Sequence, residues 1–114
     1  MSDFGATISA TKKDGGQLSN SDIADLSSKL DDIINDGEFE NAIGDPMSSS
    51  FERDQGKSVA IVQLSEHYFG GDPDEDMETF EFVKETEESD IVEIKDALIA
   101  EFPEFSFKGN FGTW

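Results

Sequence analysis

Apolar and polar residues alternate at the start of the chain, in the way that is typical of a half-buried β-strand. Phe4, Ala6, Ile8 and Ala10 are each separated by a single Gly, Thr or Ser. Because successive side chains of a strand point to opposite faces, this spacing places all four apolar side chains on one face. The Asp14-Gly15-Gly16 sequence then favours a turn. The pattern therefore predicts a strand at the beginning of the chain and a break after it.

The next segment changes to the periodicity of a helix. Ile23, Leu26 and Leu30 recur at intervals of three and four residues, which places them on one side of a helix. A serine on either side of position 20 is a suitable N-cap, and a glycine follows the periodic run. The spacing predicts a helix over residues 20–36.

Three further strands are predicted from apolar runs in the middle of the chain. Residues 48–53 have an extended pattern, and residues 58–69 contain the longest apolar run, which we expect in the middle of the sheet. Residues 77–85 place Phe80 and Phe82 on one face of a third strand. Glycine-containing turns separate these segments.

A second helix is predicted over residues 89–102, because Ile91, Ile94 and Leu98 form an apolar stripe at helical spacing. Pro103 ends it, since the residue before a proline is disfavoured in a helix. Phenylalanines then alternate with polar residues over residues 105–111, which predicts a closing strand.

The predicted order of elements is β-α-β-β-β-α-β, or β-α-β-β-α-β if residues 48–53 do not form a strand. Either order indicates an α+β fold, with an antiparallel-rich sheet of four or five strands and two helices packed on one face. The opposite face of the sheet is expected to expose polar residues such as Ser106, Lys108 and Asn110. With 114 residues, the chain is expected to form a single domain, residues 1–114.

The charge of the chain restricts its partners. The chain carries 27 acidic and eight basic side chains, a net charge of −19. Such a charge repels nucleic acids and anionic membranes, and it attracts basic proteins. The chain has no cysteine, which excludes disulfides, thiolate metal sites and cysteine nucleophiles. No signal peptide or membrane-spanning run is visible, so a cytoplasmic protein is expected.

The acidic residues are densest over residues 72–101, which contain thirteen carboxylates and two lysines. A concentrated field of this kind accelerates encounters with a basic protein. The sequence thus predicts a non-enzymatic binding protein without a cofactor, of the inhibitor, immunity-protein or nucleic-acid-mimic kind, and the alternative is a face that only contacts solvent. The residues expected to contact the partner are Asp74, Asp76, Glu78, Glu81, Glu87 and Glu88, with Tyr68 as an aromatic anchor.

A weak calcium site is a second hypothesis. Asp72, Asp74 and Asp76 have the spacing of the first three ligands of an EF-hand loop. Met77 and Val83 stand where that loop needs Gly and Glu, so the match is poor.

A small enzyme that uses His67 is a third hypothesis. His67 is the one histidine of the chain, and it could act as a general base beside Glu66 or a distant Asp. The sequence contains no nucleophile elbow, phosphate loop or zinc-protease pattern to support this hypothesis.

Overall fold

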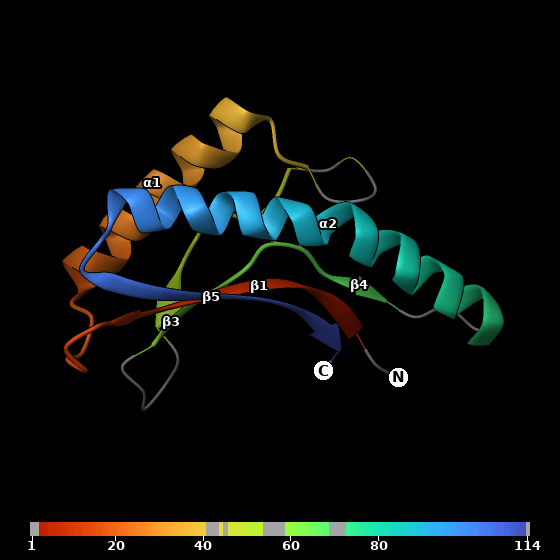
Figure 1. Cartoon of the computed structure of the whole chain (residues 1–114), viewed down its shortest axis with the longest axis horizontal. Helices are drawn as coiled ribbons and strands as arrows, with labels where there is room; N and C mark the ends of the chain where they lie inside the picture. The colour runs from red at the N-terminus through yellow and green to blue at the C-terminus, as the bar shows by residue number, and fades with distance from the viewer. Residues whose placement is uncertain (1–2, 41–43, 45, 54–58, 69–72, 114) are drawn as a thin grey trace.

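The protein forms an antiparallel sheet with two helices on one face (Figure 1). This is a computed structural model, and it describes residues 3–40, 44, 46–53, 59–68 and 73–113. The strands are β1 (Asp3–Lys12), β2 (Glu52–Arg53), β3 (Ala60–Gln63), β4 (His67–Tyr68) and β5 (Phe105–Thr113), and the helices are α1 (Asn20–Gly37) and α2 (Pro73–Glu101). The predicted α+β class and the predicted order of element types are confirmed, although the strands in the middle of the chain differ from those predicted.

β1 lies at the centre of the sheet. It pairs with β5 along one edge and with β3 and β4 along the other, and β2 pairs with the far side of β3. All of these pairs are antiparallel. The sheet therefore runs from the short edge strand β2 to the long edge strand β5.

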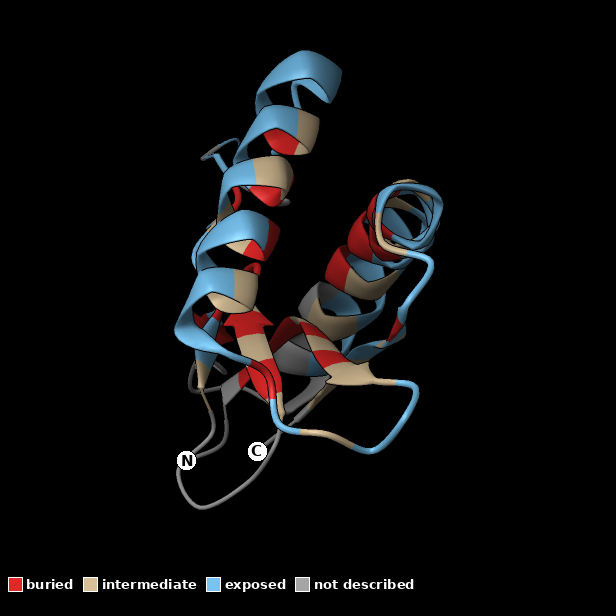
Figure 2. Ribbon diagram, turned by 90° about the vertical axis from the view of Figure 1, so that its left-hand side faces the viewer, coloured by how far each residue is buried: buried red, intermediate tan, exposed pale blue. Residues whose placement is uncertain are grey.

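The core fills the space between the sheet and the helices (Figure 2). The alternation predicted for β1 is confirmed, since Phe4, Ile8 and the alanines between and after them are fully buried. Leu26 and Leu30 of α1, together with Ile94 and Leu98 of α2, pack against these strand residues from the helical side of the sheet. Both helices carry charged residues at short intervals, and within the described residues neither offers an apolar stretch that could cross a membrane.

α1 begins with a capping box. The Asp22 N–H donates to Ser19 Oγ, and the Ser19 N–H donates to Asp22 Oδ2, each at 3.0 Å. The donation from the Ser19 backbone is the main reason why the pKa of Asp22 lies below its ordinary value, and Lys12, 3.6 Å away, lowers it further. The predicted helix is thus confirmed, with Ser19 as its cap.

Replacing Asp22 with Ala should lower the free energy of unfolding by about 1 kcal/mol at neutral pH. Because the folded-state pKa is depressed, this contribution is present above the unfolded-state pKa and is lost as the pH falls through the folded-state pKa. Urea unfolding of both proteins at neutral pH and well below pH ~3.9 measures the difference. A loss of stability that stays constant with pH would mean that the charge of Asp22 is not involved.

The single long strand predicted over residues 58–69 is wrong, because a β-bulge divides it into β3 and β4. The Ala6 carbonyl accepts from both Leu64 N–H (2.8 Å) and Ser65 N–H (3.4 Å), so two residues oppose one. Ser65 Oγ then accepts from the Ala6 N–H at 3.1 Å. The serine hydroxyl thereby replaces the backbone carbonyl that would otherwise accept from the Ala6 N–H in a regular strand pair.

The bulge changes which side chains point toward the helices. Before it, the even-numbered residues Ala60, Val62 and Leu64 are buried, and after it the odd-numbered His67 is buried. His67 pairs with Phe4, which also faces the core. One extra residue therefore turns a histidine inward that a regular strand would direct to the open face.

The strand predicted over residues 77–85 is also wrong, because the segment is helical and α2 begins already at Pro73. Proline is favoured in the first turn of a helix, and Glu, Met and Lys are good helix formers. Phe80 is half-buried with its ring against Phe4, whereas Phe82 is 60% exposed. Residues two apart in a helix are separated by about 200° of rotation, so their side chains lie on different sides. Of the predicted strand at residues 48–53, Glu52 and Arg53 form ladder pairs with β3, and the Ser48 N–H donates to the Leu64 carbonyl at 3.1 Å.

Candidate functional site

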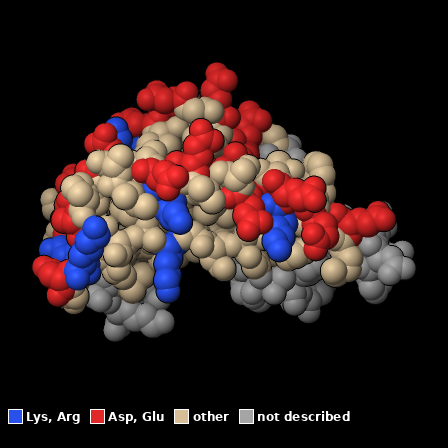
Figure 3. Space-filling view, in the orientation of Figure 1, with Lys and Arg blue, Asp and Glu red and all other residues tan. Residues whose placement is uncertain are grey.

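The acidic residues are concentrated on the helices rather than on the sheet. α2 contains twelve carboxylates and two lysines, and α1 contains five carboxylates and one lysine. β3 and β5 contain no carboxylate. In Figure 3 the carboxylates gather along the helical layer, and several basic side chains lie below them toward the sheet.

The residues predicted to contact a partner fall into three groups. Glu78, Glu81 and Glu88 are exposed on α2, as a docking surface requires, whereas Glu87 is fully buried. The backbones of Asp74 and Asp76 belong to the first turns of α2, and that of Tyr68 belongs to β4, but their side chains lie outside the described part of the structure.

Glu87 and His67 form a buried pair. His67 Nε2 lies 3.0 Å from Oε2 and 3.2 Å from Oε1 of Glu87. Glu87 has no exposed surface, and His67 is 9% exposed. One hydrogen bond joins the two side chains whichever of them carries the shared proton.

Apolar and aromatic groups surround this pair. The Phe4 ring stacks on His67 with a centroid distance of 5.4 Å, and it meets Phe80 edge-on at 5.3 Å. Val83 and Ile91, one turn of α2 before and after Glu87, are buried as well. A polar pair in such surroundings is strongly coupled, because each group is desolvated and depends on the other.

The geometry fits a structural role for His67 better than a catalytic one. The ring nitrogen that faces Glu87 is engaged inside the core, and neither group is open to a substrate. The predicted alternatives for its partner were Glu66 or an aspartate, and the actual partner is Glu87 on a distant helix. Extending the helical period of Ile91 and Ile94 backward to Phe80 would have placed Glu87 in the buried stripe.

The three aspartates of the calcium hypothesis have side chains outside the described part of the structure, so this hypothesis stays a prediction. The backbones of residues 74 and 76 belong to α2. Asp72 lies outside the described residues. Among the described side chains, no cluster of three or more histidines and carboxylates could hold a metal ion.

A cleft of about 370 Å³ lies between the C-terminal end of α1 and the middle of α2. Ile33, Phe39 and Ala97 give it apolar walls. Its carboxylates were not singled out from the sequence, because they come from two separated segments. They are Glu38 and Glu40, after α1, and Asp90 and Glu93, on α2.

Asp90 lies in surroundings that disfavour its negative charge. Its pKa is raised above the ordinary value, first by burial and then by the negative charges of Glu93 and Glu87. A carboxylate with a raised pKa is held in an unfavourable environment for its charge. A cation in the cleft would relieve that cost.

Asp90→Asn should raise the free energy of unfolding by about 0.5 kcal/mol at neutral pH. Because the folded-state pKa is raised, the wild-type protein takes up a proton and gains stability as the pH falls through that pKa. The advantage of the variant should therefore disappear in acid, where Asp90 is protonated in both the folded and the unfolded chain. Urea titrations over this pH range measure it, and a variant that is less stable at neutral pH would contradict it.

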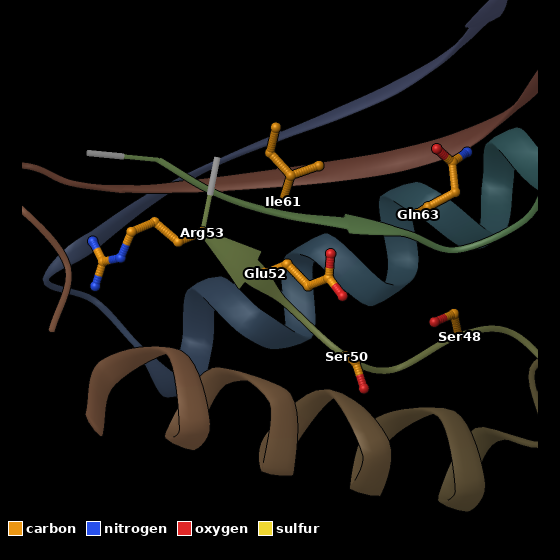
Figure 4. Close-up of a pocket in the computed structure, with 6 residues that line it drawn as sticks. All are labelled: Ser48, Ser50, Glu52, Arg53, Ile61 and Gln63. Atoms are coloured by element: carbon orange, nitrogen blue, oxygen red, sulfur yellow. The ribbon is translucent and has the colours of Figure 1, made fainter. Parts of the chain in front are cut away.

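A second cavity, of about 380 Å³, opens on the other side of the sheet (Figure 4). Ser48, Ser50 and Glu52 line it from one segment, and Ile61 and Gln63 line it from β3. The guanidinium of the sixth lining residue, Arg53, is directed away to the Leu18 carbonyl and to Asn20 Oδ1. The cavity therefore has polar walls without a cation positioned inside it.

Comparison of the chain with protein-family models, curated proteins and solved structures found no significant match.

Proposed function

We propose that the protein is a non-enzymatic binding protein whose acidic helical layer docks on a basic protein. The observation that carries this proposal is the separation of charge within the fold: the helices hold most of the carboxylates, and β3 and β5 hold none. A field concentrated on one layer steers a basic partner toward that layer and raises the association rate.

The acidic cleft is the proposed recognition point of this layer. Arginine and lysine combine an apolar stem with a cationic head. The stem of such a residue would lie against Ile33, Phe39 and Ala97, and its head would lie near Asp90 and Glu93. The raised pKa of Asp90 supports this, since a bound cation would favour the charged carboxylate.

The exposed outer side of α2 is the second part of the proposed surface. Glu78, Glu81 and Glu88 remain in it from the set predicted from sequence. Phe82 and Val92, 60% and 49% exposed, add apolar area between the carboxylates. Exposed aromatic residues are frequent anchors in protein interfaces.

Affinity capture from the native host at low and high salt tests the proposal. The bait with Glu78, Glu81 and Glu88 replaced by Lys is compared with wild type and with a control in which Glu52, Glu66 and Glu104, which are exposed and lie outside both helices, are replaced by Lys. Both variants change the net charge equally, so only the first tests the position of the charges on α2. We expect one basic protein to be retained by wild type and control at low salt, and to be lost from the α2 variant.

Adding Asp90→Asn and Glu93→Gln to the wild-type bait tests the cleft separately. These substitutions remove two charges without inserting basic groups, and they should weaken capture of the same protein. Identical protein sets on all baits would mean that the acidic layer only contacts solvent. Thermal unfolding of each bait confirms that it is folded before it is used.

A further inference from the structure

β5 is a long edge strand. It pairs with β1 from Phe105 to Thr113, and no other strand among the described residues pairs with it. The opposite edge of the sheet is formed, among the described residues, by β2 and β4, which have two residues each. Any extension of the sheet by a strand of similar length must therefore occur at β5.

The pairing with β1 determines which backbone groups of β5 face outward. The Lys13 N–H donates to the Glu104 carbonyl at 3.2 Å, at the beginning of the β1–β5 ladder. Hydrogen-bonded and non-hydrogen-bonded pairs alternate along an antiparallel ladder. The N–H and C=O groups of Phe107, Gly109 and Phe111 therefore point away from β1, to the free edge.

This edge lacks most of the features by which proteins prevent strand pairing. Such features include proline, bulges, charged side chains and short strand length. β5 has nine residues, no proline and no carboxylate, and its one charged residue is Lys108. In a chain with a net charge of −19, an acid-free edge is a surface where a second negatively charged chain can approach.

We propose that β5 pairs antiparallel with β5 of a second copy of this chain, about a two-fold axis at Gly109. This register gives the two strands their greatest overlap and joins the two sheets into one. It is an isologous contact, in which each residue meets the same surface on the other copy. Phe107 would lie opposite the partner's Phe111 on the helical face, a cross-strand aromatic pair of the kind that stabilises sheets.

α2 lies close to the same two-fold axis, so it would also contact its copy in the dimer. A Cβ on Gly109 would overlap Cγ2 of Ile91, so α2 lies directly against the centre of β5. The Lys95 side chain also reaches this point, with its Cδ 3.9 Å from the same Cβ position. Since α2 contacts both β1 and β5, strand spacing of about 4.8 Å would bring the two copies of α2 to about 10 Å, a usual helix packing distance.

The charges on the side of α2 that faces β5 are arranged so that they can pair with those of a second copy. Lys95 and Glu88 are seven residues apart on the same side of the helix, one on either side of Ile91. A two-fold axis beside Ile91 places Lys95 opposite the partner's Glu88, and Glu88 opposite the partner's Lys95. In the described residues, Lys95 has no carboxylate within ion-pair distance of its own chain, so it is available for this contact.

The net charge predicts how the pairing depends on salt. Two chains of −19 repel each other at long range, and salt screens this repulsion. The dimer should therefore become tighter as salt is added. Docking on a basic protein should become weaker under the same conditions, so the two proposals fail independently.

Substitution of Asn110 tests the pairing. Asn110 is exposed on the open face of the sheet, and in the proposed register it lies opposite the partner's Lys108. Asn110→Glu creates two opposite-charge pairs by symmetry, and Asn110→Lys creates two like-charge pairs. We expect the glutamate variant to tighten the dimer and the lysine variant to weaken it, each by about twofold to thirtyfold in Kd.

Sedimentation equilibrium of wild type and both variants, over a range of protein and salt concentrations, measures these constants. An effect of net charge alone would give the reverse order, because glutamate increases the repulsion between the chains and lysine decreases it. The reverse order, or a wild-type chain that stays monomeric at all concentrations, would overturn the proposal. Circular dichroism checks that both variants keep the fold.

Discussion

Glu87→Ala is expected to lower the free energy of unfolding by about 3–5 kcal/mol, the range measured when one member of a buried charged pair is removed. The carboxylate is fully buried, and both of its oxygens lie within 3.2 Å of His67 Nε2. Its loss leaves the imidazole among Phe4 and Phe80 without its partner, and it opens a cavity beneath α2. Urea unfolding of the two proteins at neutral pH measures the difference.

Replacing both members of the pair is the matched control. The double variant His67→Leu, Glu87→Leu should recover stability to within about 1 kcal/mol of wild type or exceed it, because well-packed apolar residues often replace a buried polar pair without loss. Glu87→Gln, which keeps the shape and a hydrogen bond, should fall between the two. If Glu87→Ala costs less than about 1 kcal/mol, the pair is not desolvated in solution.

Gly5→Ala is expected to cost about 3 kcal/mol, at the upper end of the range for overpacking. A Cβ at this position would overlap the carbonyl oxygen of Ser65, which is a backbone atom at the bulge. That carbonyl is held by the Gln63 side chain, which donates to it at 2.7 Å, and the Ser65 N–H is bonded to β1. The bulge cannot move away without losing these bonds.

Gly112→Ala controls for the general effect of alanine in a strand. Gly112 is the direct partner of Gly5 across the β1–β5 ladder, and its nearest obstacle is the flexible side chain of Asn110, at 3.3 Å. It should be neutral or should stabilise the fold by up to about 1 kcal/mol. Thermal unfolding compares the two variants, and equal effects would show that the contact with the bulge is not the cause.

These two expectations concern the same part of the molecule. The bulge directs the His67 side chain into the core, and the absence of a side chain at Gly5 leaves room for the bulge. Glu87 then provides the hydrogen-bond partner of His67. Glu87 was predicted as a contact for a partner, and its burial removes it from that set. Substitution of Glu87 should therefore lower the free energy of unfolding without changing the exposed carboxylates of α2. The stability test of Glu87 is thus independent of the docking test.

Most of the fold followed from local patterns in the sequence. The alternation from Phe4 to Ala10, the periodicity of α1 and the alternating phenylalanines of β5 each predict an element whose type the structure confirms. In these segments each apolar side chain lies where a regular period puts it. Composition likewise established a strongly acidic surface, because few charged residues can be buried.

Two errors arose where a buried polar group interrupts the pattern. In α2, Glu87 occupies a position in the apolar stripe between Val83 and Ile91, so the helical period of apolar residues can be recognised only after it. With that period hidden, Phe80 and Phe82 indicated a strand. At Ser65, the bulge shifts the alternation of buried and exposed residues by one position, and no local sequence pattern indicates this shift.

The sequence by itself determined the α+β class, the single domain and the acidic character of the chain, because these depend on periodicity and composition within short segments. Only the tertiary structure decided that Glu87 meets His67 in the core, that Asp90 and Glu93 share a cleft with Glu38 and Glu40, and that β5 is left at the edge of the sheet. These contacts join residues far apart in the chain, and their energies depend on burial and on the neighbours that packing supplies.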